Sequence, residues 1–326
     1  MKKPKIYVTR DLPGDAISFL RKYCEVEVNM EDRTLTKEEL LHNIQEKDGV
    51  LCQLLDVLNE EVLEQAKHVK VFANCAVGYN NIDVDAATQR GILITNTPGV
   101  LDDATADLTW ALLFAAARKV PSAERYIKEG KFTNWSPNLF LGRDITGKTL
   151  GVIGAGRIGQ NFARKAKAFG MKVYYYNRNR NRGFEEETGA IYASKEELLR
   201  IADFVTLHVP LTEETHHFIG EKEFEMMKKT AILINVARGP VVDEKALVNA
   251  LETGQIGGAG LDVFENEPKV ESALLDMENV VVTPHIGSGT IEARSNMAMM
   301  AAKNVLAGAR GELPPNCLNP EALKFV

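Results

Sequence analysis

The sequence predicts an α/β protein of two domains, each built on a parallel sheet. The chain has 326 residues, and at roughly 150 residues per domain this length favours two. Strand-like and helix-like segments alternate from the N-terminus onward, and a second alternating series follows a polar stretch at 130–147. Parallel strands need a crossover between them, so regular alternation is typical of this fold class.

In the first series, short apolar runs predict strands separated by helices. Thr36 is the expected N-cap of one helix, with Glu39 as its capping-box partner, and Gly91 ends another. The expected strands cover 5–9, 25–29, 49–53, 69–74 and 92–95, and the expected helices cover 13–23, 36–46, 59–66 and 83–90.

The second series contains six expected strands, the number in a full dinucleotide-binding sheet. A long apolar helix at 102–120 precedes them, and a core-packed helix at 291–309 leads to a tail whose three prolines predict an extended chain. The six strands are expected at 149–153, 172–176, 204–209, 231–236, 260–264 and 280–283.

Composition narrows the class of protein. With 45% hydrophobic and 26% charged residues the chain is globular, and its net charge of −6 argues against nucleic-acid or membrane partners. No secretory signal and no apolar run of about 20 residues is present, so we expect a cytoplasmic protein. The four cysteines form no CxxC pair, and His216 and His217 have no partner at metal-ligand spacing, so we expect free thiols and no metal site.

A glycine-rich loop connects the strand at 149–153 with the helix that follows. The segment from Gly154 to Gly159 reads GxGxxG, in which Gly154 allows the turn and Gly156 lets the backbone approach a pyrophosphate. Gly159 would let the helix pack on the strand, and the free N–H groups of the first turn would face phosphates. The alternative is a turn without a ligand.

The residues after the next strand bear on the choice of cofactor. An NAD site usually has Asp or Glu there, but the sequence has Asn177 followed by Arg178 and Arg180. Guanidinium groups pair with a 2′-phosphate that a carboxylate would repel, so we expect NADP(H) to be preferred over NAD(H). The alternative is a solvated basic loop.

Three polar residues follow the last three strands: Arg238, Glu267 and His285. Ligands of open α/β sheets bind beyond the carboxyl ends of the strands, so these side chains could meet at a nicotinamide. Arginine could hold the carboxylate of a 2-oxoacid, histidine could protonate its carbonyl oxygen, and the glutamate could keep the histidine charged. Taken singly, each could be a surface charge or a turn residue.

The segments GAGRIGQ, HVPLTEET, NVARGPVVDE, GLDVFENEP and TPHIGS together resemble the D-isomer-specific 2-hydroxyacid dehydrogenase family over nearly the whole chain. The resemblance is closest to glyoxylate/hydroxypyruvate reductases and bacterial 2-ketogluconate reductases. It implies a Rossmann dinucleotide-binding domain (100–286) and a flavodoxin-like substrate domain (1–99 and 287–326), both doubly wound, with the active site in the cleft between them.

By the same resemblance, Arg238, Glu267 and His285 are catalytic, and Arg238 and His285 also bind substrate. Backbone amides of Val77 and Gly78 would hold the substrate carboxylate, and Asp262 would lie near the nicotinamide amide. The expected cofactor site comprises Gly154, Ala155, Gly156, Arg157, Ile158, Gly159, Asn177, Arg178, Arg180, Val236, Ala237, Asp262 and Gly287.

The expected activity is therefore NADPH-dependent reduction of a small 2-oxoacid to the D-2-hydroxyacid, with glyoxylate, hydroxypyruvate and 2-ketogluconate as candidate substrates. The resemblance also implies a homodimer, in which Trp135 either reaches the neighbouring subunit or packs within its own chain. Alternatives are a dehydrogenase of formate or of a phosphorylated glycerate, and a redox-sensing, NAD(H)-binding corepressor-like module.

Overall fold

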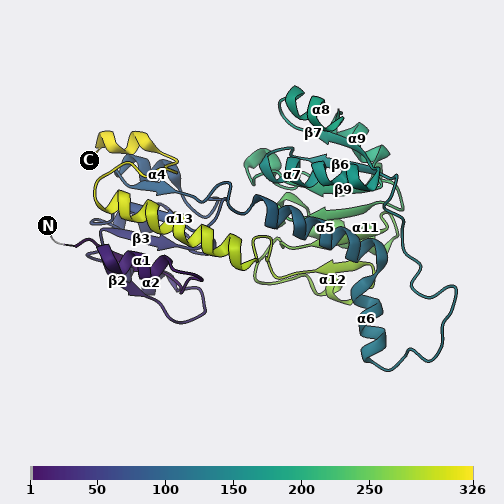
Figure 1. Ribbon diagram of the computed structural model, residues 1–326, viewed down its shortest axis with the longest axis horizontal. Coiled ribbons are helices and arrows are strands. Elements are labelled where there is room, and N and C mark those ends of the chain that lie inside the picture. Colours follow the sequence, from purple (N-terminus) through teal and green to yellow (C-terminus); the bar gives the residue numbers. More distant parts are fainter. Residues whose placement is uncertain (1–2, 326) are drawn as a thin grey trace. The chain divides into compact units, whose positions relative to one another are not determined.

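The computed structural model describes residues 3–325, which form two compact units (Figure 1). The first comprises Met1–Leu101 and Ser288–Val326, and the second is the continuous segment Asp102–Gly287. Each unit has its own parallel sheet. Among the described residues, no helix is both long and apolar enough to cross a membrane.

The sheet of the first unit has the strand order β2-β1-β3-β4-β5, the flavodoxin-like arrangement. The strands are β1 (Lys5–Val8), β2 (Glu25–Val28), β3 (Gly49–Cys52), β4 (Val71–Asn74) and β5 (Leu93–Thr95). The helices are α1 (Ala16–Tyr23), α2 (Lys37–Ile44), α3 (Glu60–Gln65), α4 (Val84–Gln89), α13 (Ile291–Ala309) and the 3-10 helix η4 (Pro320–Phe325).

The sheet of the second unit has the order β12-β11-β10-β9-β6-β7-β8, a Rossmann sheet with one further strand. The strand order reverses between β6 and β9, where dinucleotides bind in this fold. The strands are β6 (Thr149–Ile153), β7 (Lys172–Tyr176), β8 (Ile191–Tyr192), β9 (Phe204–Leu207), β10 (Ile232–Asn235), β11 (Gly258–Leu261) and β12 (Val280–Val282). The helices are α5 (Asp102–Arg118), α6 (Val120–Lys128), α7 (Arg157–Ala166), α8 (Arg182–Thr188), α9 (Lys195–Ile201), α10 (Glu221–Met226), α11 (Glu244–Glu252) and α12 (Ser272–Asp276), with short 3-10 helices η1 (Lys167–Phe169), η2 (Glu213–Thr215) and η3 (Gly239–Val241).

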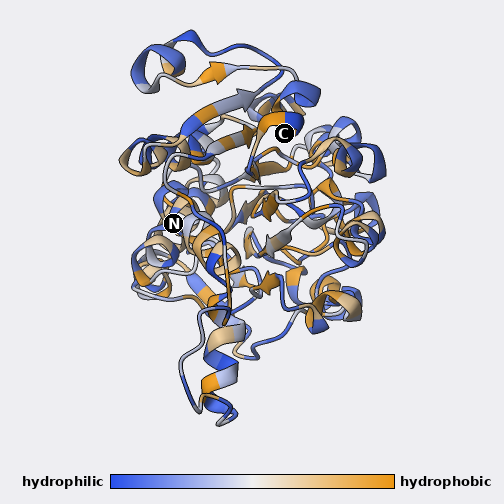
Figure 2. Ribbon diagram, turned by 90° about the vertical axis from the view of Figure 1, so that its right-hand side faces the viewer, coloured by the Kyte–Doolittle hydropathy of each residue, from blue (hydrophilic) through white to orange (hydrophobic). Residues whose placement is uncertain are grey.

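The central strands are apolar on both faces because helices cover both faces of a parallel sheet. All residues of β3, β4, β9 and β10 are buried. Figure 2 shows orange, hydrophobic segments on strands in the interior and blue, hydrophilic segments on the outer loops and helices. The predicted α/β class and the Rossmann sheet are therefore confirmed, and β6, β7 and α13 have the predicted bounds.

Three local predictions are wrong. The apolar helix ends at Arg118 because Lys119 adopts a left-handed conformation (φ 54°), and α6 starts anew just before Pro121. The tail forms η4 instead of remaining extended. Strand β8 has only two residues, too few to show an alternating pattern in the sequence.

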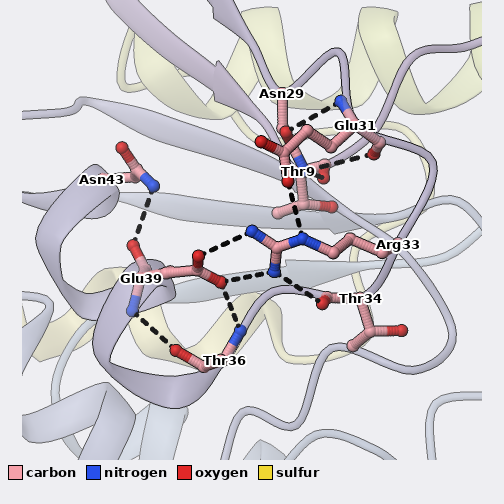
Figure 3. A network of polar contacts seen from close by, with 8 residues as sticks. All are labelled: Thr9, Asn29, Glu31, Arg33, Thr34, Thr36, Glu39 and Asn43. Atoms are coloured by element: carbon pink, nitrogen blue, oxygen red, sulfur yellow. Dashed lines mark hydrogen bonds and ion pairs between the residues drawn. The ribbon is translucent and has the colours of Figure 1, made fainter.

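The start of α2 in the first unit matches its prediction. Thr36 accepts a hydrogen bond from the backbone N–H of Glu39, and the Glu39 carboxylate accepts one from the N–H of Thr36. Arg33 binds both oxygens of Glu39 at 2.7 Å and also contacts Glu31 (Figure 3). The Arg33 hydrogen bonds, followed by that of Thr36, lower the pKa of Glu39 to about 2. This network fixes the loop between β2 and α2.

The C-terminal segment completes the first unit. The buried Asn319 side chain accepts the N–H of Ile94 at 2.7 Å and donates to the carbonyl of Ile92. On α13, the buried Asn304 donates to the carbonyl of Asn96. Edge strand β5 is therefore stabilised by residues more than 200 positions later in the chain.

His208 follows β9, and its ring is buried against Phe162, with 5.5 Å between the ring centroids. Neither ring nitrogen has a hydrogen-bond partner among residues 3–325. Burial lowers the pKa of His208 to about 3. Below pH ~6.5 the unfolded chain therefore binds a proton that the folded chain does not, and folding stability falls as pH decreases.

We expect His208→Leu to weaken this pH dependence. The free energy of unfolding of the parent should lose up to about 1.4 kcal/mol per pH unit at this site between pH 6 and pH 4, and the variant should not. Urea unfolding at pH 7 and pH 5 measures the difference, with exposed His68→Leu as the control. Identical losses in the parent and His208→Leu would contradict the prediction.

Candidate active site

The glycine-rich loop lies at the reversal point of the second sheet. Gly154 has φ +94°, and a Cβ there would lie 2.7 Å from the carbonyl carbon of His208, so the turn requires glycine. A Cβ on Gly156 would meet nothing within 4 Å, which leaves the backbone at the N-terminus of α7 open to a ligand. At the start of α7, the hydrogen bonds of the helix backbone begin with the N–H of Gln160, which donates to the carbonyl of Gly156. The preceding N–H groups of Arg157, Ile158 and Gly159 suit a pyrophosphate.

The segment after β7 contains the residues expected to select the cofactor. Asn177 accepts the N–H of Ala155 at 3.0 Å, which ties it to the glycine loop. Arg180 binds both oxygens of Glu185, the shortest contact being 2.7 Å, and this hydrogen-bonded pairing lowers the pKa of Glu185 to about 2. Arg178 is exposed. The hydrogen bond from Thr212 is the main cause of the lowered pKa of Glu214 in η2, and the positive charge of Arg178 adds a smaller effect. Arg178 is therefore better placed than Arg180 to meet an added phosphate.

His285 and Glu267 form a pair at the carboxyl ends of β12 and β11. His285 Nδ1 lies 2.8 Å from Glu267 Oε2, and the other carboxylate oxygen accepts the N–H of Phe264 at 3.0 Å. Burial is the largest influence and raises the pKa of Glu267, but the hydrogen bond and charge of His285 outweigh it and the pKa is lowered. Since Nδ1 faces the carboxylate, Nε2 is the nitrogen available to a substrate.

Arg238 follows β10, at the same edge of the sheet. Its carbonyl accepts from the Asn235 side chain at 2.9 Å, and its guanidinium donates to the Ala237 carbonyl at 2.7 Å. Burial lowers the pKa of Arg238, and the charge of Glu267 opposes this effect. The guanidinium of Arg238 is thus largely removed from water and lies within reach of the Glu267 charge. Such a group suits the binding of an anionic substrate, because charge-assisted hydrogen bonds are strong away from water.

Asp262 fixes the turn that carries His285. Its carboxylate accepts the Thr283 hydroxyl at 2.6 Å and the N–H groups of Ile286 and Gly287 at 2.8 and 2.7 Å. Burial raises the pKa of Asp262, partly offset by these hydrogen bonds. The turn holds His285 at φ +52°, a conformation that non-glycine residues rarely adopt. Asp262 thus positions His285. The sequence analysis expected Asp262 only near the nicotinamide amide and did not predict this role.

In the first unit, Val77 and Gly78 follow β4. Their carbonyls accept from the side chains of Asn96 and Asn74, at 2.9 and 2.8 Å. Within residues 3–325, no acceptor is recorded for the two amide N–H groups. Two neighbouring amide N–H groups, in a loop held by the hydrogen bonds to its carbonyls, suit a carboxylate.

The sequence offers His216 and His217 no partner at metal-ligand spacing, but the fold brings a carboxylate to His217. Glu265, 48 positions after His217, lies with its Oε1 2.8 Å from His217 Nε2. No local spacing in the sequence signals this contact. Two buried residues, Val236 and Ala237, connect β10 to Arg238. The N–H of Ala237 donates a hydrogen bond to the side-chain oxygen of Asn235.

A family model for the NAD-binding domain of D-isomer-specific 2-hydroxyacid dehydrogenases matches residues 110–287. Over 325 residues the chain is 50% identical to a glyoxylate reductase of Thermococcus litoralis, covering 98% of each chain. The chain belongs to this dehydrogenase family. The expected family and enzyme class are therefore confirmed, and the chain is an oxidoreductase with an NAD-binding domain.

Two solved structures extend the comparison. A glyoxylate reductase of Paecilomyes thermophila is 35% identical with a TM-score of 0.87, covering 98% of this chain and 99% of that one. An NADPH-dependent glyoxylate/hydroxypyruvate reductase of Sinorhizobium meliloti, in complex with NADP and malonate, is 30% identical with a TM-score of 0.88, covering 98% of each chain.

Proposed function

We propose that the protein reduces glyoxylate, and more slowly larger 2-oxoacids such as hydroxypyruvate, to the D-2-hydroxyacid with NADPH. The observation that carries the proposal is the 2.8 Å pair of His285 and Glu267, beside Arg238, in the unit that contains the glycine loop. The full-length identity of about 50% to glyoxylate reductases supports glyoxylate as the first substrate to test.

Each residue has a separate role in this proposal. When bound, the reduced nicotinamide supplies a hydride to the carbonyl carbon. Arg238 binds and polarises the substrate, and the amides of Val77 and Gly78 hold its carboxylate. His285 donates the Nε2 proton to the carbonyl oxygen as the alcohol forms, and Glu267 stabilises the protonated ring before transfer.

The residues around the glycine loop fit the cofactor. The open backbone at Gly156 and the free N–H groups of α7 would bind the pyrophosphate. Arg178 would pair with the 2′-phosphate, since no carboxylate occupies position 177 and Arg180 already binds Glu185. Gly287, Asp262, Val236 and Ala237 would border the nicotinamide.

A panel of 2-oxoacids assayed at 340 nm with both reduced cofactors tests the proposal. Glyoxylate with NADPH should give the highest kcat/KM, above hydroxypyruvate and 2-ketogluconate. Oxidation of formate or phosphoglycerate in a parallel assay with the oxidised cofactors, without reduction of any 2-oxoacid, would point to a different dehydrogenase. Nucleotide binding without any turnover would favour a redox-sensing module.

We also propose that the protein is a homodimer joined through α6 and the loop after it. We call α6 and the loop after it the arm. In Figure 1 the arm extends away from the second sheet, and no residue of α6 is buried. Ile127, Phe132 and Trp135 are 62%, 54% and 77% exposed. Contact with a second copy would cover these three large apolar side chains, which lie close together in the sequence.

Charges on the arm should therefore prevent dimer formation. We expect Ile127→Glu combined with Phe132→Glu to sediment as a monomer at concentrations where the parent is a dimer, because burying two carboxylates is unfavourable. Met30→Glu, which alters an exposed apolar residue of the first unit, is the control and should stay dimeric. A parent that is monomeric, or a double variant that remains dimeric, would contradict the proposal.

Trp135 offers a separate test of whether the arm reaches the partner's active site. If it does, Trp135→Ala should change KM for hydroxypyruvate while KM for glyoxylate changes little, because only the larger substrate would extend to the indole. Steady-state kinetics with the two substrates measure the effect. Equal KM values for hydroxypyruvate in parent and variant would remove Trp135 from the site.

A further inference from the structure

We infer that His216, His217 and Glu265 form a binding site for a divalent transition-metal ion such as Zn²⁺. One ligand atom from each residue lies within 4.8 Å of those of the other two. Two imidazoles and a carboxylate are a typical zinc ligand set, with a fourth position left for water. This cluster is separate from the pair of His285 and Glu267.

The geometry is close to what a metal needs. His217 Nε2 and Glu265 Oε1 are 2.8 Å apart, and the rings of His216 and His217 stack with centroids 4.0 Å apart. In a tetrahedral zinc site with bonds of about 2.0–2.1 Å, neighbouring ligand atoms lie about 3.4 Å apart. An ion between them therefore requires the pair of His217 and Glu265 to open by about 0.6 Å and the nearest His216 nitrogen to lie at a similar spacing.

Other polar groups lie behind the two inner ligands. Asp243 Oδ2 lies 3.9 Å from His217 Nδ1, which is beyond hydrogen-bond distance, so this carboxylate acts through its charge on the nitrogen that would not bind the ion. The second oxygen of Glu265 accepts the N–H of Glu244 at 3.1 Å. Metal-binding histidines commonly have such a carboxylate on their other nitrogen, which raises the basicity of the ligand.

The backbone also holds the histidines in place. His217 adopts φ +48°, and its N–H donates to the Pro240 carbonyl at 2.8 Å. Ile219 pairs with Val242 in the adjacent segment, with its N–H on the Val241 carbonyl at 3.1 Å. The segment that carries both histidines is thus held by the segment at 240–242 before any ion binds.

His216 is exposed and the His217 side chain is 35% exposed, so an ion can enter from solvent. A thiolate is absent from the ligand set, and neutral imidazole favours Zn²⁺, Co²⁺, Ni²⁺ or Cu²⁺ over Mg²⁺ or Ca²⁺. Bound metal would restrain Glu265, two positions before Glu267.

Co²⁺ titration of the full-length protein tests the site without turnover, because tetrahedral Co²⁺ absorbs in the visible range. We expect one equivalent to bind, Zn²⁺ to displace it, and Mg²⁺ not to compete. His216→Ala and Glu265→Gln should each weaken binding at least tenfold, and Asp243→Asn about tenfold through its effect on His217. Retained far-ultraviolet circular dichroism shows that each variant is folded.

His68→Ala, which removes an exposed histidine of the first unit, is the matched control and should bind like the parent. His285→Ala distinguishes this site from the catalytic pair. The inference is overturned if the parent binds no Co²⁺, if His216→Ala and Glu265→Gln bind it like the parent, or if binding is lost only in His285→Ala.

Discussion

His285→Ala is expected to lower kcat for glyoxylate reduction by roughly 10²–10⁴, the usual contribution of general acid catalysis. The variant loses the group that donates a proton to the carbonyl oxygen, while the glycine loop and the Arg238 region stay intact. Glu267 would then accept only the N–H of Phe264 with its Oε1, and its Oε2 would lose the imidazole at 2.8 Å.

The lower kcat of His285→Ala should come from the proton-transfer step and not from weaker cofactor binding. NADPH fluorescence titration should give a Kd for His285→Ala close to that of the parent. His68→Ala provides a histidine variant remote from these strand ends in the sequence, and it should keep the parent kcat. A turnover of His285→Ala within a few-fold of the parent would remove His285 as the proton donor.

The second large effect concerns the cofactor, for which we expect kcat/KM to be about 10- to 150-fold higher with NADPH than with NADH. That range corresponds to one charge-assisted contact of ~1.5–3 kcal/mol between Arg178 and the 2′-phosphate. The preference should decrease with added salt, because Arg178 is exposed and its interaction is screened.

Asn177→Asp combined with Arg178→Ile should reverse the preference. Aspartate can still accept the N–H of Ala155 with one oxygen, as Asn177 does, and can offer the other to a ribose hydroxyl. Arg182→Ile is the matched control, since it removes a nearby exposed arginine and should leave the ratio unchanged. Equal or higher kcat/KM with NADH in the parent would mean that these arginines only form a solvated loop.

The sequence predicts most of the fold because most helices and strands have a local signal. The capping box at Thr36 and the glycine loop before α7 depend on residues a few positions apart, and both occur as expected. The strand-end residues Arg238, Glu267 and His285 could also be found, since parallel strands bring their carboxyl ends to one edge.

What the sequence could not predict depends on contacts between distant residues. Glu265 meets His217 across 48 positions, and Arg180 is occupied by a glutamate on the following helix. The role of Asp262 in holding the turn of Ile286 and Gly287 likewise exists only after folding. The sequence shows which side chains can form hydrogen bonds and ion pairs, but not which residues they contact in the folded protein.

The pairing of β5 with the C-terminal segment affects the order of events on the ribosome. The second unit is continuous, so its sheet can close as soon as Gly287 has emerged. The first unit must wait for Asn304 and Asn319, although its five strands were synthesised much earlier. Domains generally fold as units during synthesis, so the nascent chain holds an unfinished N-terminal sheet beside a finished Rossmann sheet. During this interval, chaperone binding should concentrate on β3 and β4, whose apolar residues stay exposed until α13 has emerged and packs on them.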